Sequence, residues 1–76
     1  MADLVNRAIS HRMEHHTSKG TLLSMVTTYE GTMSMAQVWN ERREQVHETS
    51  LFSGQDHAEF AHSCACDWVL YESDKV

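Results

Sequence analysis

The sequence predicts a mainly α-helical fold, a small bundle of three or four helices that forms one domain over residues 1–76. Two observations favour helices. Apolar residues recur at spacings of three and four in several segments, and the chain contains no proline, the residue that most often interrupts a helix. The alternative is an α+β fold with a β-hairpin at about residues 21–35.

The segment from Gln55 to Ser73 has the clearest helical pattern and is predicted to be the central helix. At about 100° per residue, one broad half of this helix is apolar and the other half is mostly polar. The apolar half comprises Ala58, Phe60, Ala61, Cys64, Ala65, Trp68, Val69 and Tyr71. We expect this half to be buried, where Trp68 and Phe60 would each contribute roughly 2–3 kcal/mol. Leu70 projects from the polar half.

Two further helices are predicted closer to the N-terminus. The first runs from Asp3 to His16, because its apolar residues repeat at helical spacing, and it ends at a turn signal over residues 17–20. The second runs from Met35 to Glu48, where Ser34 and Gln37 form a capping box. The apolar residues of the first helix are Leu4, Val5, Ala8, Ile9 and Met13, and those of the second are Met35, Val38, Trp39 and Val46.

The segment from Thr21 to Gly31 fits two structures. As a helix it begins at Thr21 and ends at Gly31, with its apolar residues on one face. As a strand it alternates along Leu23, Met25, Thr27 and Tyr29, and Glu30-Gly31 turns the chain into a second strand. We favour the helix because an isolated two-stranded ribbon is poorly stable. This choice decides the fold class.

The net charge of −5 is unevenly distributed. Residues 1–43 carry four acids and five bases, whereas the residues from Glu44 onward carry seven acids and only Lys75. An acidic half repels nucleic-acid phosphates and attracts a basic protein surface. The charge therefore disfavours direct nucleic-acid binding.

Localisation is predicted from two absences. The chain has no run of 18 apolar residues and no basic, then apolar, leader, so we expect a cytoplasmic protein without a membrane contact. Cys64 and Cys66 lie two positions apart on the predicted helix, so they point in different directions and cannot form a disulfide with each other.

A metal site is the sharpest chemical hypothesis. His11 and His15 are four residues apart in one predicted helix, and His62 and Cys66 are four apart in another, so each pair lies on one helical face. If the two helices packed together, two imidazoles and at least one thiolate could bind zinc. The spacing matches no common zinc finger, so we expect no resident cofactor, with zinc as the alternative.

Enzymatic activity is not predicted. Cys66 and His62 could form a nucleophile and base, with Asp67 or Glu59 orienting the imidazole. However, the sequence has no glycine-rich phosphate loop and no evident oxyanion hole. We therefore expect no catalytic residues.

The favoured function is a small acidic protein-interaction module, a regulator or inhibitor that binds a protein partner, which could be basic and handle nucleic acid. Five methionines and two tryptophans exceed what one small core needs, and such side chains line partner surfaces. The predicted binding residues are Glu59, Asp67, Trp68, Leu70, Glu72 and Asp74. A homodimer is one way for so short a chain to gain stability.

Overall fold

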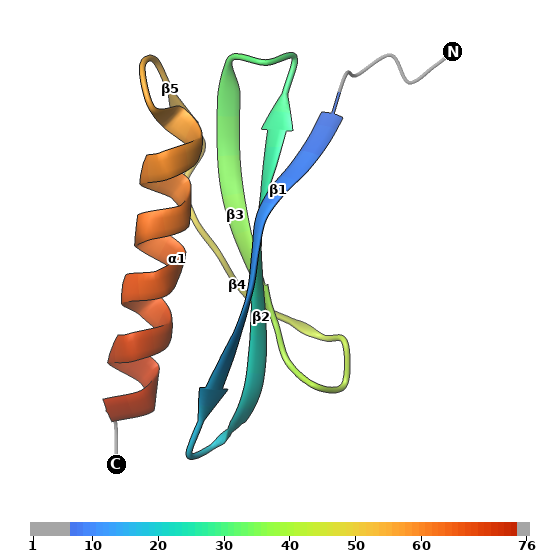
Figure 1. Cartoon of the computed structure of the whole chain (residues 1–76), viewed down its shortest axis with the longest axis vertical. Coiled ribbons are helices and arrows are strands. Elements are labelled where there is room, and N and C mark those ends of the chain that lie inside the picture. The colour runs from blue at the N-terminus through green and yellow to red at the C-terminus, as the bar shows by residue number, and fades with distance from the viewer. Residues whose placement is uncertain (1–6, 75–76) are drawn as a thin grey trace.

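One antiparallel sheet with a helix across one of its faces makes up the computed structural model, which describes residues 7–74 (Figure 1). The sheet order is β1-β2-β3-β4, and β5 pairs with β3. The elements are β1 (Arg7–Thr17), β2 (Gly20–Tyr29), β3 (Met33–Trp39), β4 (Gln45–Glu48), β5 (Phe52–Ser53) and α1 (His57–Asp74). The predicted helical bundle is therefore wrong, and the α+β alternative fits.

The hairpin of β2 and β3 lies where that alternative placed it. Glu30 and Gly31 have φ angles of 54° and 72°. Positive φ at both central residues is characteristic of the type I′ turn, whose twist matches that of the flanking strands. The amide of Thr32 donates to the carbonyl of Tyr29 at 3.1 Å and closes the turn.

The predicted helix from Asp3 to His16 is wrong where the structure describes it, because residues 7–17 form the edge strand β1; residues 3–6 lie outside the described part. The turn predicted at residues 17–20 is confirmed, and there the hydroxyl of Thr17 donates to the carbonyl of Gly20 at 2.6 Å. A bulge interrupts the pairing of β1 with β2 between Ser10 and Met13, and His11 has a φ of 52°. The extra residue shifts which side chains of β1 face α1.

The predicted helix from Met35 to Glu48 is also wrong. The chain turns after Trp39, and the side-chain oxygen of Asn40 accepts hydrogen bonds at 2.9 Å from the amides of Arg42 and Glu44. The chain then returns as β4. Between β4 and β5, buried Thr49 takes the place of a strand partner, because its amide donates to the carbonyl of Ala36 and its hydroxyl accepts from the amide of Ala36.

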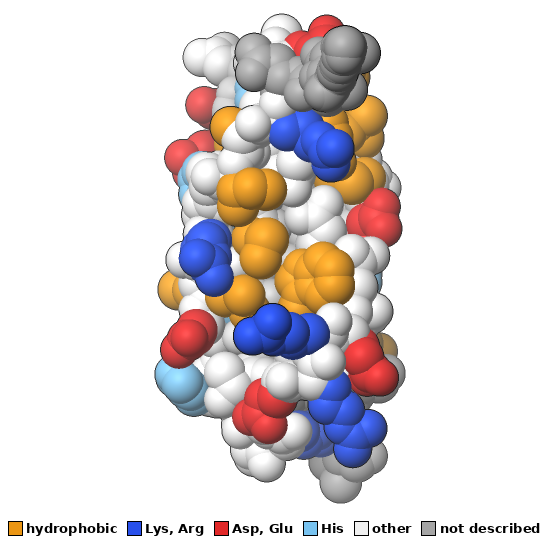
Figure 2. Space-filling model, turned by 90° about the vertical axis from the view of Figure 1, so that its right-hand side faces the viewer, with side chains coloured by type: hydrophobic (Ala, Val, Ile, Leu, Met, Phe, Trp, Pro, Cys, Tyr) orange, Lys and Arg blue, Asp and Glu red, His pale blue; other side chains and the backbone are white. Residues whose placement is uncertain are grey.

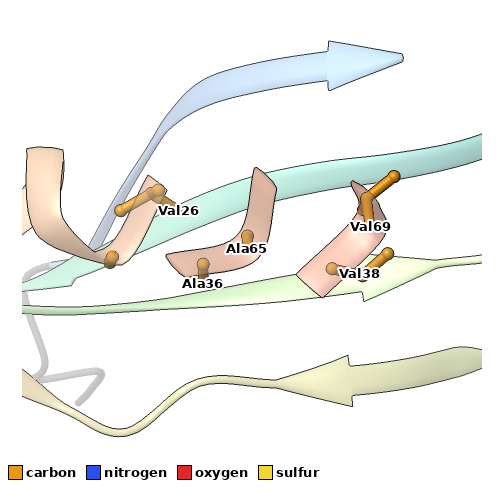
Figure 3. Packing of buried hydrophobic residues seen from close by; sticks show 6 residues of the cluster. Val26, Ala36, Val38, Ala65 and Val69 are labelled. Atoms are coloured by element: carbon orange, nitrogen blue, oxygen red, sulfur yellow. The ribbon is translucent and has the colours of Figure 1, made fainter. Parts of the chain in front are cut away.

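The helix predicted near the C-terminus is confirmed, but the side it buries differs from the prediction. Ala61, Ala65 and Val69 lie on one line along α1 and are buried, whereas Phe60 and Tyr71 are exposed. The small alanine side chains let the helix backbone approach the sheet closely. The core is Val26, Ala36 and Val38 from the sheet with Ala61, Ala65 and Val69 from α1 (Figure 3).

Between Arg7 and Asp74 no helix combines the length and the apolar character that a membrane span requires.

Candidate functional site

The side of α1 that faces away from the sheet combines apolar and acidic side chains. Phe60, Leu70 and Tyr71 are 55%, 65% and 62% exposed. Glu59 and Asp67 are exposed beside them, and α1 contains no lysine or arginine. We call these five residues the outer helix face. Glu59, Asp67 and Leu70 were predicted as partner-binding residues, and the structure places all three on this side.

The other predicted partner-binding residues lie elsewhere or are not described. Trp68 is half-buried and stacks on His47 of β4, with ring centroids 4.5 Å apart and planes 3° from parallel. Glu72 is half-buried, and its backbone carbonyl accepts a hydrogen bond from the Lys19 ammonium at 3.1 Å. The side chain of Asp74 falls outside what the structure describes. Trp68 therefore packs against the core rather than projecting as an exposed anchor.

The face of the sheet opposite α1 is a second apolar surface. Strand side chains alternate between the two faces, so the residues of β2 and β3 between the buried core positions point away from α1. We call them the open sheet face: Leu23, Met25, Thr27, Tyr29, Met33, Met35, Gln37 and Trp39. Among the described residues, no helix or strand covers this face (Figure 1). All of its members except Thr27 are only half-buried.

A hollow of about 380 Å³ lies on the open sheet face, lined by Leu23, Met25 and Trp39 together with Arg12, Asn40 and Arg43. Figure 2 shows this side of the molecule, with apolar side chains gathered at its centre and side chains of both charges around them. The indole Nε1 of Trp39 is buried and has no hydrogen-bond partner within residues 7–74. The face therefore differs from an ordinary solvated sheet surface, where polar side chains would alternate with the core positions.

The four predicted metal ligands lie in one region, where β1 meets α1. The Sγ of Cys66 is 3.6 Å from Nε2 of His62 and 4.0 Å from the Sδ of Met13. The rings of His11 and His62 have centroids 5.1 Å apart. The bulge in β1 explains this arrangement, because it brings His11 to the same side as Met13 and His15. Their proximity, expected between two helices, is thus achieved between a strand and a helix.

The donor atoms in this region are mostly engaged with other groups. Nε2 of His15 is 2.9 Å from the hydroxyl of Ser24, and Nε2 of His11 is 3.6 Å from a carboxylate oxygen of Glu59. Within residues 7–74, no three His, Cys, Asp or Glu side chains converge closely enough to hold a metal ion. The zinc hypothesis therefore stays a prediction, and it requires His11 and His15 to leave these partners.

Burial shifts the pKa values of two side chains in this region. It lowers the pKa of His15 below its usual value of about 6.5, and the neighbouring His62 lowers it further. Burial likewise raises the pKa of the Cys66 thiol, and Asp67 adds to the increase. A raised thiol pKa keeps the nucleophilic thiolate scarce at neutral pH.

The open sheet face was not predicted from the sequence. The alternation of Leu23, Met25, Thr27 and Tyr29 could have identified it, because the strand interpretation of that segment rests on this pattern. Phe60 and Tyr71, in turn, were predicted to lie in the core. Comparison of the chain with protein-family models, with curated proteins and with solved structures finds no significant match.

Proposed function

We propose that this chain is a small acidic protein-interaction module, a regulator or inhibitor that binds a basic surface of another protein through its outer helix face. The main support for this function is the exposure of apolar side chains on α1. Three large apolar side chains, Phe60, Leu70 and Tyr71, are each more than half exposed on a helix that is already anchored by its opposite side. Such exposed apolar side chains beside charged groups are typical of binding surfaces.

The spacing on α1 suits recognition by a groove. Phe60, Asp67, Leu70 and Tyr71 are separated by intervals that bring them to one side of the helix, the arrangement by which an amphipathic helix enters an apolar groove. Because Ala61, Ala65 and Val69 hold the helix on the sheet, binding at the outer face requires no unfolding. The module would therefore present a preformed helix, which reduces the entropic cost of binding.

Charge defines the partner class. α1 carries four acids and no lysine or arginine, and Glu59 and Asp67 adjoin the apolar side chains. The partner is expected to have an apolar groove bordered by lysine or arginine, which includes proteins that handle nucleic acid. Occupying such a groove would block its normal ligand. The two free cysteines fit a reducing compartment, and we place the module in the cytoplasm.

The test is a comparison of captures from a lysate of the native host. The immobilised baits are the wild-type chain, the variant Phe60→Ser/Leu70→Ser, and the control variant Ile9→Ser. Ile9 is 54% exposed on β1 and pairs with Thr27 on the side of the sheet away from α1, so it matches the exposure and chemistry of the altered residues on the other side of the molecule. We expect a basic protein that wild type and Ile9→Ser retain and that Phe60→Ser/Leu70→Ser binds at least about tenfold more weakly.

The purified partner then allows a test of electrostatic steering. Glu59→Lys/Asp67→Lys should lower the association rate, and the difference should shrink as salt is added. If Phe60→Ser/Leu70→Ser retains every protein that wild type captures, the outer helix face is not the binding surface. If charge reversal leaves the association rate unchanged at low salt, the partner's surface is not basic.

A further inference from the structure

The side-chain sizes on the two faces of the sheet are unusual for an isolated chain. Among the described residues, the fully buried core contains only valine and alanine as apolar residues, and the bulkier Leu22, Phe52 and Trp68 are partly buried against it. Most of the bulky apolar side chains of the hairpin, including Leu23, Met25, Met35 and Trp39, point to the open sheet face. Bulky apolar residues concentrated on a face that nothing in residues 7–74 covers indicate that another protein surface packs there.

The charges at the border of the open sheet face have both signs. Arg12 and Arg43 line the hollow beside Trp39, and Glu14 lies on β1 directly opposite Leu23, on the same face. Figure 2 shows basic and acidic side chains around the apolar centre. A surface that pairs with a copy of itself must supply both members of each charge pair, because the same patch is present on both sides. The border of the open sheet face meets this requirement.

The size of the face also fits a dimer. The molecule has principal extents of 43, 26 and 16 Å, and the open sheet face is viewed along the intermediate axis in Figure 2. The side of the molecule seen there therefore projects over at most about 700 Å² (43 by 16 Å), the same order as the roughly 800 Å² of accessible surface that each partner contributes to a stable interface.

We infer that a second copy of this chain covers the open sheet face, so that two sheets pack face to face around a two-fold axis. Packed sheets of this kind lie about 10 Å apart and interlock their inner side chains. The bulky residues of both copies then form the central core of the dimer, and each α1 lies on the outside. The outer helix faces remain accessible on opposite sides, so the dimer would present two of them.

Sedimentation equilibrium of the wild-type chain, across micromolar concentrations, tests this inference directly. We expect a species of twice the 8.7 kDa mass of one chain. Met25→Glu places a charge at the centre of the open sheet face and should weaken dimerisation at least tenfold, with an unchanged circular dichroism spectrum. Arg12→Glu, an exposed substitution at the border that leaves the core intact, should also weaken it. The matched control, Leu70→Glu on the outer helix face, should leave the dimer intact.

Three outcomes would overturn the inference: a wild-type chain that stays monomeric at every concentration, assemblies larger than two chains, and a dimer that Leu70→Glu dissociates while Met25→Glu and Arg12→Glu do not. This test is independent of the proposed function, because Met25 and Arg12 lie on the other side of the molecule from the outer helix face. Loss of partner capture with an intact dimer, or the reverse, separates the two proposals.

Discussion

Val38 lies in the core between the sheet and α1 and has no exposed surface (Figure 3), so Val38→Ala tests the packing of the fold. The substitution removes two methyl groups, each worth about 0.8 kcal/mol by transfer from water. The small cavity left behind adds to the cost, and we expect the free energy of unfolding to fall by about 2 kcal/mol. A single core in so short a chain rarely supplies more than about 3–5 kcal/mol, so this one substitution should remove about half of the stability.

The measurement is urea denaturation followed by circular dichroism, at one protein concentration because dimerisation would itself stabilise the fold. Gln45→Ala, at an exposed position of β4 in the same sheet, is the control and should cost less than about 0.5 kcal/mol. The m-value should stay constant in both variants. If Val38→Ala costs no more than Gln45→Ala, Val38 is not in a packed core and the assignment of the two sheet faces fails.

Three further predictions follow from individual residues. Glu30 has a left-handed backbone conformation at the hairpin turn, and asparagine tolerates this conformation better than glutamate does. Glu30→Asn should therefore raise the free energy of unfolding by about 0.5–1 kcal/mol. A decrease would argue against the type I′ turn. Burial, and secondarily His62, lower the pKa of His15, so below about pH 6.5 the unfolded state binds more protons than the native state. The stability that neutral His15 contributes is therefore complete above pH 6.5 and is lost as the pH falls below that value. In pH-dependent denaturation curves, His15→Gln should flatten the decline of the unfolding free energy below pH 6.5. An unchanged curve would exclude His15 as the source of the decline. Because burial and Asp67 raise the pKa of Cys66, Asp67→Asn should speed its alkylation by iodoacetamide, followed by mass spectrometry, and an equal or slower rate would contradict the assigned role of Asp67.

The strands were difficult to recognise because their hydrophobic patterns do not show simple alternation. In β3 the residues facing the core are Ser34, Ala36 and Val38, and those on the open sheet face include methionine and tryptophan. Because both faces of β3 carry apolar residues, hydrophobicity does not alternate clearly with a period of two. Its apolar residues instead resemble the apolar stripe of a helix. Such strands are expected where both faces of a sheet are covered.

β1 was misassigned for a different reason. Its bulge at His11 inserts one residue into the alternation, so Ile9 and Met13, four positions apart, lie on opposite faces of the strand instead of on one helical face. An edge strand with polar residues on both faces has little pattern to recognise. The signal that could have identified the sheet was the Glu30-Gly31 turn, because a pair suited to positive φ between two β-branched and aromatic segments favours a hairpin.

The helix α1 was predictable, but its orientation was not, and the reason lies in what helical periodicity measures. Periodicity weights side chains by hydrophobicity, so Phe60 and Tyr71 dominated the predicted buried side. Packing against a twisted sheet also depends on how closely the backbones approach, and Ala61 and Ala65 permit that approach where an aromatic residue would not. The smaller side chains therefore occupy the contact with the sheet, and the larger ones become available for binding.

The prediction made from the composition of the chain depends less on the secondary structure than the predictions made from residue positions do. The excess of methionine and tryptophan over the needs of one small core does not depend on whether a segment is a strand or a helix. Met25, Met35 and Trp39 now lie on the open sheet face, and the acids of α1 lie beside exposed apolar side chains. Because the fold divides these two features between opposite sides of the molecule, a chain predicted to have one docking surface has two candidates, an acidic one suited to a basic partner and a mixed-charge one suited to a copy of itself.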